Sequence, residues 1–200
     1  MPQNAYCKFL FSREQFLFCY IAVPDMPDRL PAIGHDGKYY SLFKTVESAT
    51  QGLQLARRVS HNGHEVAITQ AGKNYIIWAE EASAVVYQPD QDTNISPSVK
   101  NHTEVLKVTF SSSPCLILSD LSPESFCLLT VSNSVAPVIG FQHQQTYYRL
   151  IQREQDAKTI VDAIAERACR GGKIAVVPMK NDYGIFVSDP SAVPTTRRNS

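Results

Sequence analysis

The sequence has no long hydrophobic run and no excess of charge of either sign. No stretch approaches the roughly 18 consecutive apolar residues of a membrane-spanning helix, so we expect no membrane insertion. The 200 residues include 19 Lys and Arg against 19 Asp and Glu, and the basic residues form no stripe. This balance argues against nucleic acid or an anionic membrane surface as the partner.

Cysteine is sparse and odd in number. Five cysteines lie in a chain too long to depend on disulfides for its stability. Residues 1–8 contain no basic segment leading into an apolar run, so the pattern of a secretory signal peptide is absent. Both observations favour a reducing compartment, and we expect a cytoplasmic protein.

The common catalytic motifs are also missing. No Gly-x-Ser-x-Gly sequence occurs, which excludes the usual nucleophile elbow. The Gly171-Gly172-Lys173 sequence follows a predicted helix instead of opening one, so it lacks the free N-terminal amides that hold a phosphate. The sequence therefore predicts no particular reaction, and we expect a protein without cofactor or catalysis.

What the sequence does contain is an internal match. Residues 7–87 align without a gap with residues 115–195, at an offset of 108 positions. About 17 of about 81 aligned positions are identical, where unrelated sequences of this composition would share about 5. The residues common to both copies include Cys7, Phe18, Cys19, His35, Tyr39, Tyr40, Ala49, Gly63, Tyr75 and Ile77. The match predicts a tandem duplication of one module.

The first part of each copy is rich in strand-forming residues. Apolar runs at 6–11 and 16–23 enclose a short polar stretch and predict an antiparallel hairpin. Residues 24–31 contain three prolines, which predicts a loop, and 39–43 predicts a third strand.

The hydrophobic period then changes to that of a helix. Apolar residues spaced by 3, 4, 3 and 3 positions form one stripe, at Val46, Ala49, Leu53, Ala56 and Val59. Gly63 is placed to end this helix, and two further strands are expected at 65–69 and 75–79. The second copy repeats the elements at 114–118, 125–131, 147–151, 157–168, 173–177 and 183–187.

The predicted fold is α+β, a tandem duplication of a β-β-β-α-β-β module. We expect each module to form an antiparallel sheet with one helix on its face. A module of about 80 residues is small for an independent core, so the two should pack as a pseudo-two-fold dimer with a shared core. The predicted boundaries are 1–87 for the first module, 88–112 for a linker with an extra strand near 104–110, 113–193 for the second module and 194–200 for a disordered tail.

This organisation favours a binding or adaptor protein. The order of elements is similar to the core of the bacterial type III secretion chaperones, which work as homodimers, and the resemblance implies a chaperone-like chain that holds a protein or peptide partner. Ile33, His35, Phe141 and His143 coincide in the two copies and are the candidate binding residues. For Ile33 and Phe141 the alternative is burial in the core. We expect a monomer, because each module already has the other as its partner.

The alternative function is a metal-dependent enzyme or small-ligand binder with a site shared between the modules. His35 and His143, with Glu81 and Asp189 past the last predicted strand of each copy, supply imidazole and carboxylate ligands for a divalent metal. In outline this set resembles the shared metal site of glyoxalase-like tandem modules. The alternative for these residues is a solvated surface position without a role.

The cysteine pairs suggest a further metal hypothesis. In the predicted hairpin Cys7 lies close to Cys19, and Cys115 close to Cys127, so four thiolates could bind zinc. Their alternative is burial as small apolar residues.

Overall fold

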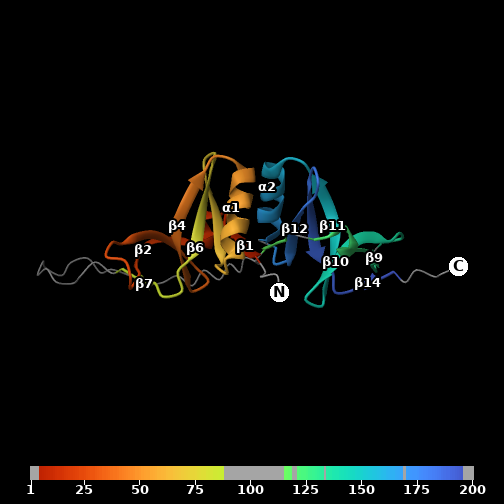
Figure 1. The fold of residues 1–200 in the computed structure, drawn as a ribbon, viewed down its shortest axis with the longest axis horizontal. Coiled ribbons are helices and arrows are strands. Elements are labelled where there is room, and N and C mark those ends of the chain that lie inside the picture. Colours follow the sequence, from red (N-terminus) through yellow and green to blue (C-terminus); the bar gives the residue numbers. More distant parts are fainter. Residues whose placement is uncertain (1–4, 88–114, 119–120, 133, 169, 196–200) are drawn as a thin grey trace, which may run out of the picture.

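The computed structural model describes residues 5–87, 115–118, 121–132, 134–168 and 170–195. Within these residues the chain is a mixed α+β protein in which fourteen strands form one sheet and two helices lie side by side at its centre (Figure 1). The predicted linker at 88–112, its strand near 104–110 and residues 196–200 of the predicted tail lie outside the described residues.

The elements of the first half follow the chain from the centre of the sheet to one end. They are β1 (Ala5–Phe9), the 3-10 turn η1 (Arg13–Gln15), β2 (Leu17–Ala22), β3 (Leu30–His35), β4 (Lys38–Val46), α1 (Ala49–His61), β5 (Val66–Ala71), β6 (Asn74–Glu80) and β7 (Val85–Val86). The second half contains β8 (Cys115–Ile117), η2 (Pro123–Ser125), β9 (Phe126–Thr130), β10 (Val138–His143), β11 (Thr146–Glu154), α2 (Ala157–Ala168), β12 (Ile174–Pro178), β13 (Tyr183–Ser188) and β14 (Val193–Pro194).

The strand order is β14-β9-β10-β11-β13-β12-β8-β1-β5-β6-β4-β3-β2-β7. The central strands β1 and β8 are antiparallel, with Cys7 opposite Cys115. Outward from this pair, strands of the two halves follow one another in the same sequence. We call the strands from β5 to β7 arm one and those from β12 to β14 arm two.

The predicted hairpin of 6–11 with 16–23 is wrong. β1 pairs in parallel with β5 and antiparallel with β8, whereas β2 pairs with β3 and β7. Cys7, Phe9 and Leu10 are fully buried, and a strand that is apolar on both faces is best placed in the middle of a sheet. The two parallel pairs, β1 with β5 and β8 with β12, also make the sheet mixed where an antiparallel one was expected.

The predicted loop at 24–31 ends one turn too late, because β3 begins at Leu30 and contains Pro31. The ladder between β3 and β4 starts only at Ala32, so the missing N–H of Pro31 leaves no gap in it. The short outer strands β7 and β14 were also not predicted, and β14 includes the first residue of the expected tail. Each half therefore has two more strands than the predicted module.

The helix prediction is confirmed in both halves. Ala49, Leu53, Ala56 and Val59 are buried, as are the corresponding residues of α2. Gly63 and Gly171 follow the helices with φ of 90° and 81°, a left-handed conformation that a glycine adopts without a Cβ clash. The Ser48 hydroxyl accepts a hydrogen bond from the Gln51 amide and so caps the start of α1.

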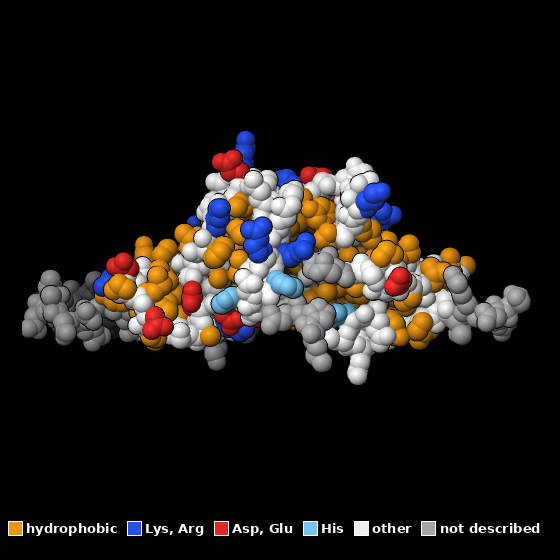
Figure 2. Space-filling model, in the orientation of Figure 1, with side chains coloured by type: hydrophobic (Ala, Val, Ile, Leu, Met, Phe, Trp, Pro, Cys, Tyr) orange, Lys and Arg blue, Asp and Glu red, His pale blue; other side chains and the backbone are white. Residues whose placement is uncertain are grey.

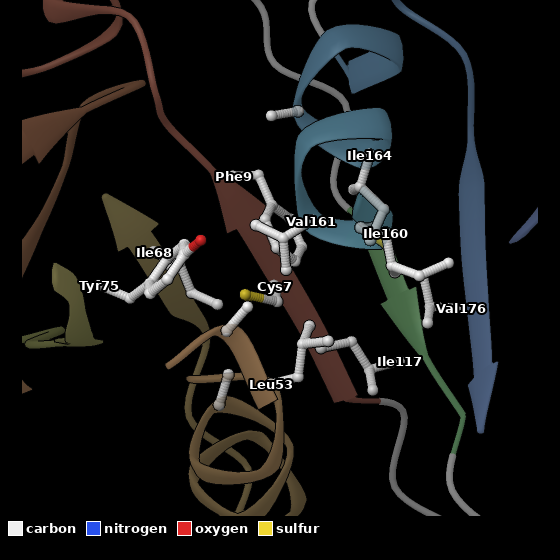
Figure 3. Close-up of a cluster of buried hydrophobic side chains, with 14 of the residues drawn as sticks. Cys7, Phe9, Leu53, Ile68, Tyr75, Ile117, Ile160, Val161, Ile164 and Val176 are labelled. Atoms are coloured by element: carbon white, nitrogen blue, oxygen red, sulfur yellow. The ribbon is translucent and has the colours of Figure 1, made fainter. Parts of the chain in front are cut away.

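The largest hydrophobic cluster draws on both halves, as the shared-core prediction requires. Leu53 of α1 and Ile160, Val161 and Ile164 of α2 gather over the central strands (Figure 3). Cys7 and Phe9 from β1 and Ile117 from β8 form the floor of this cluster (Figure 3). Burial of these side chains holds the helices against the join between β1 and β8.

Candidate functional site

The two predicted hydrophobic anchors are core residues. Ile33 on β3 and Phe141 on β10 are both 0% exposed. Ile33 packs with Leu10, Tyr40 and Trp78, whereas the Phe141 ring stacks on the Tyr148 ring at 5.2 Å in the other half. They are not available to a partner, so core burial, the alternative reading of these positions, is what the structure shows.

The four predicted metal ligands are not brought together. Eight strands lie between β3, which carries His35, and β10, which carries His143, so the two rings are about 40 Å apart along the sheet. Glu81 accepts a hydrogen bond from Ser41 at 2.7 Å, and Asp189 pairs with Arg149 at 3.0 Å. Among the described residues no group of three or more His, Cys, Asp or Glu side chains has the geometry to hold a metal ion. The chain does not assemble the predicted shared site.

The cysteine prediction fails with the hairpin on which it depended. Four strands separate β1, with Cys7, from β2, with Cys19. Burial raises the pKa of Cys7 and of Cys115, so these thiols stay protonated at neutral pH. They behave as small apolar residues at the centre of the sheet.

A buried charged cluster, which sequence reasoning missed, lies in the first half. We call it the Glu65 network, and it consists of Lys8, His35, Asp36, Lys38, Tyr40, Glu65 and Glu80. At its centre the Lys8 ammonium, on a residue only 7% exposed, lies 3.3 Å from carboxylate oxygens of both Asp36 and Glu65. The Lys38 ammonium lies 2.6 Å from Glu65 and 2.9 Å from Glu80.

The partners of Glu65 keep it ionised. Burial by itself raises the pKa of Glu65, but hydrogen bonds from Lys38 and Tyr40 and the charge of Lys8 together hold it below its ordinary value. The Tyr40 hydroxyl donates to Glu65 at 2.6 Å, and burial followed by this bond raises the pKa of Tyr40. The network thus carries fixed charges and stabilises the junction of β1, β4, β5 and β6.

His35 connects this network to η1. Its Nδ1 lies 2.6 Å from the Gln15 carbonyl oxygen and its Nε2 3.0 Å from the Asp36 carboxylate. Burial lowers the pKa of His35, and the hydrogen bond with the Gln15 carbonyl opposes that effect. The imidazole therefore holds the turn after β3 against the turn that precedes β2.

The second half has no counterpart of the network. The positions 108 residues after Lys8, Asp36, Lys38, Glu65 and Glu80 hold Leu116, Gln144, Thr146, Lys173 and Ser188. Leu116 instead packs with Phe141 and Phe186 in an apolar cluster. The signal that could have found the network is this exchange of charge between aligned positions.

The outer strands of arm one carry exposed hydrophobic residues, which we call the β2 surface. Its members are Leu17 (60% exposed), Phe18 (56%), Tyr20 (59%), Val85 (65%) and Val86 (38%). Arm two exposes Leu128, Ile139 and Val193 in the corresponding region. Figure 2 shows hydrophobic side chains gathered at both ends of the molecule. Exposed apolar surface of this kind commonly marks a binding site.

The β2 surface also has an open hydrogen-bonding edge. β7 pairs with β2 only at Ile21 and Ala22, and the Tyr87 amide adds one bond to the Tyr20 carbonyl. In the described part of the chain, no strand pairs with the outer side of β2 from Leu17 to Cys19. The Arg13 guanidinium lies 5.2 Å from the centre of the Phe18 ring, beside this open stretch.

Comparisons of the chain with protein-family models, curated proteins and solved structures gave no match. Within the described residues, neither α1 nor α2 is long and apolar enough to cross a membrane.

Proposed function

We propose that the chain is a non-catalytic binding or adaptor protein that holds a segment of a protein partner on the β2 surface. The observation that carries the proposal is the set of large side chains that β2 and β7 expose beside an unpaired edge. Aromatic and aliphatic residues of this kind are enriched at the centres of protein interfaces.

The exposure of these residues is selective along β2. Ile21 on the same strand is 0% exposed, so β2 buries the residue it needs for stability. Leu17, Phe18 and Tyr20, by contrast, remain more than half exposed although they are apolar or aromatic. A partner that covers them would remove this surface from water and gain binding free energy at about 25 cal/mol per Å² of apolar area, before the costs of association.

We also propose that the two halves descend from one duplicated module and form a pseudo-two-fold pair. The strand registers support this: Tyr40 pairs with Glu80, and 108 positions later Tyr148 pairs with Ser188. The ladders of β4 and β11 are interrupted at corresponding places, between Leu42 and Lys44 and between Leu150 and Gln152. Central strands that meet at Cys7 and Cys115, also 108 positions apart, fit an axis between them.

The turns support the same proposal. Asp36 and Gly37 have φ of 50° and 76°, and the aligned Gln144 and Gln145 have φ of 45° and 65°. Two successive left-handed residues are the conformation of a two-residue hairpin turn, and glutamine adopts it only at some cost. In this proposal the backbone of the ancestral module is retained while the side chains of the arms have diverged. We further propose a cytoplasmic monomer, in keeping with the free thiols of Cys7, Cys19, Cys115 and Cys127.

Affinity capture with a matched pair of variants tests the binding function. The Leu17→Ser/Tyr20→Ser double variant changes the β2 surface, and Leu128→Ser/Ile139→Ser makes a comparable change in arm two. Tagged proteins are incubated with extract of the source cells, and the bound proteins are measured by quantitative mass spectrometry. We expect a stoichiometric partner that the wild type and the arm-two variant retain and the β2 variant loses. A partner retained equally by all three would refute the proposal.

A further inference from the structure

We infer that the partner binds by strand addition: an extended peptide pairs with the outer edge of β2 at Phe18 and directs an acidic side chain toward Arg13. The inference rests on the proposed function and specifies how the β2 surface holds its partner.

The backbone of β2 is oriented for such pairing. The Tyr87 amide donates to the Tyr20 carbonyl oxygen at 2.8 Å, so the polar groups of Tyr20 face outward, toward β7. In an antiparallel ladder the N–H and C=O of one residue face the same side, and every second residue repeats the direction. The N–H and C=O of Phe18 therefore also face outward, where they are free to bond an added strand.

The sequence gives a reason why β7 stops short of Phe18. The pairing of Tyr20 with Tyr87 continues, two residues along each strand in opposite directions, to Phe18 and Pro89. Proline has no N–H to donate to the Phe18 carbonyl. A continued β7 would leave this bond unmade, and a peptide from another protein can make it.

The side chains around this edge determine which peptide fits. Phe18 and Tyr20 project from the same face of β2, so apolar residues at alternate positions of the added strand would pack on them. Arg13 is exposed and lies over the Phe18 ring, and no carboxylate of the described residues forms an ion pair with it. Arg29, over the Tyr87 ring, places a second guanidinium at the other end of the edge. These charges favour a peptide with acidic residues flanking its apolar positions.

The predicted strand near 104–110 of the same chain is too tightly tethered to be the occupant. Residues 111–114 connect it to Cys115 of β8 and span at most about 17 Å when fully extended. Six strand steps, or about 29 Å along the sheet, separate β8 from β2. Figure 1 shows β2 at the outer end of arm one and β1, the neighbour of β8, at the centre. A separate protein is therefore the occupant that the geometry favours.

The test uses two fluorescent peptides and the full-length chain. The acidic peptide is Glu-Thr-Val-Thr-Val-Thr-Glu, which places valine and glutamate on one face of a strand, and its counterpart has lysine at both ends. Binding is followed by fluorescence anisotropy. Because Cys19 follows Phe18, a synthetic segment 1–18 that carries N-methyl-Phe18 can be ligated to residues 19–200, which removes one outward N–H and retains the ring. Unmodified ligated protein is the control.

We expect the acidic peptide to bind saturably and at least about threefold more tightly than the lysine peptide. N-methylation of Phe18 should weaken binding about five- to tenfold. Arg13→Glu, a change on an exposed side chain, should reverse the preference between the peptides, and Leu128→Ser in arm two should leave affinity unchanged.

Two results would overturn the inference. If N-methyl-Phe18 protein and its control bind the acidic peptide equally, the partner does not add as a strand. If neither peptide binds, or Arg13→Glu leaves the preference unchanged, the acidic chemistry is wrong. In both cases the proposed function stands or falls separately, on the capture of a partner by the wild type and its loss in Leu17→Ser/Tyr20→Ser.

Discussion

At the scale of single residues, the first half differs from the second in its buried charges. Lys8, Asp36 and Glu65 form ion pairs beneath arm one, where the second half has Leu116, Gln144 and Lys173. A buried ion pair often contributes little net stability relative to apolar residues, but the loss of one partner leaves a costly unpaired charge. The network therefore makes the geometry of arm one depend on several residues together.

Glu65→Gln should destabilise the protein by about 2–3 kcal/mol, because it leaves the buried Lys8 ammonium with fewer compensating charges. The aligned residue provides the control: Lys173 is exposed, so Lys173→Gln should change the unfolding free energy by less than about 0.5 kcal/mol. Urea denaturation followed by circular dichroism measures both. Adding Lys8→Leu to Glu65→Gln should recover part of the loss, and equal stability of the two single variants would contradict this account of the network.

His35 should make the protein less stable at mildly acidic pH. Its pKa in the folded state lies below its ordinary value of 6.5, chiefly because it is buried. The unfolded chain then takes up a proton first as the pH falls, so the contribution of neutral His35 is present above pH 6.5 and is lost below it. The unfolding free energy of the wild type should fall from pH 7.5 to pH 5, and that of His35→Gln should fall less. His143 also has a pKa lowered by burial, so His143→Gln serves as the comparison. A steeper pH dependence in His35→Gln than in the wild type would show that the sign is wrong.

At the scale of elements, local patterns predicted the helices and their ends but not the partners of the strands. The stripe of Ala49, Leu53, Ala56 and Val59 and the glycine after it are features of one continuous segment, and the structure agrees with both. The position of β1 depends on contacts with β5 and β8, which lie far along the chain. Lys8 also concealed the two-sided burial of β1, because a lysine in the middle of a strand normally indicates a solvated face.

The candidate site was harder to predict for a related reason. The Glu65 network joins residues 8, 35–40, 65 and 80, and no short motif contains them. Residue type alone also could not separate Ile33, which is fully buried, from Leu17, which is 60% exposed. Which apolar residue faces a partner is decided by how the arm curves, and that is a property of the whole sheet.

The turns after the helices provide a test with a built-in control. Gly171 has φ of 81°, so Gly171→Ala should cost about 1 kcal/mol through backbone strain alone, since an added Cβ meets no neighbour within 4 Å. The adjacent Gly172 has no positive φ and equally open surroundings, so Gly172→Ala should be neutral or slightly stabilising. Thermal unfolding by calorimetry distinguishes the two variants. A lower melting temperature for Gly172→Ala than for Gly171→Ala would contradict the assignment of Gly171 as the left-handed residue.

At the scale of the whole molecule, one sheet extends through both halves and the helices lie over its centre (Figure 1). β1 and β8 use each other's edges, and α1 and α2 share the same core, so the surfaces that an isolated half would present to another copy are already buried. Light scattering should therefore give a mass near that of a single chain, 22.3 kDa, at micromolar concentration. A stable dimer of about twice that mass would mean that the two halves do not satisfy one another.

The most direct test of the account is the affinity of the captured partner for three forms of the chain, measured by isothermal titration calorimetry. If the β2 surface holds the partner, Leu17→Ser/Tyr20→Ser should raise the dissociation constant at least about tenfold. Leu128→Ser/Ile139→Ser should leave it within about twofold of the wild type. Equal weakening by both variants, or by neither, would contradict the claim that arm one is the binding arm.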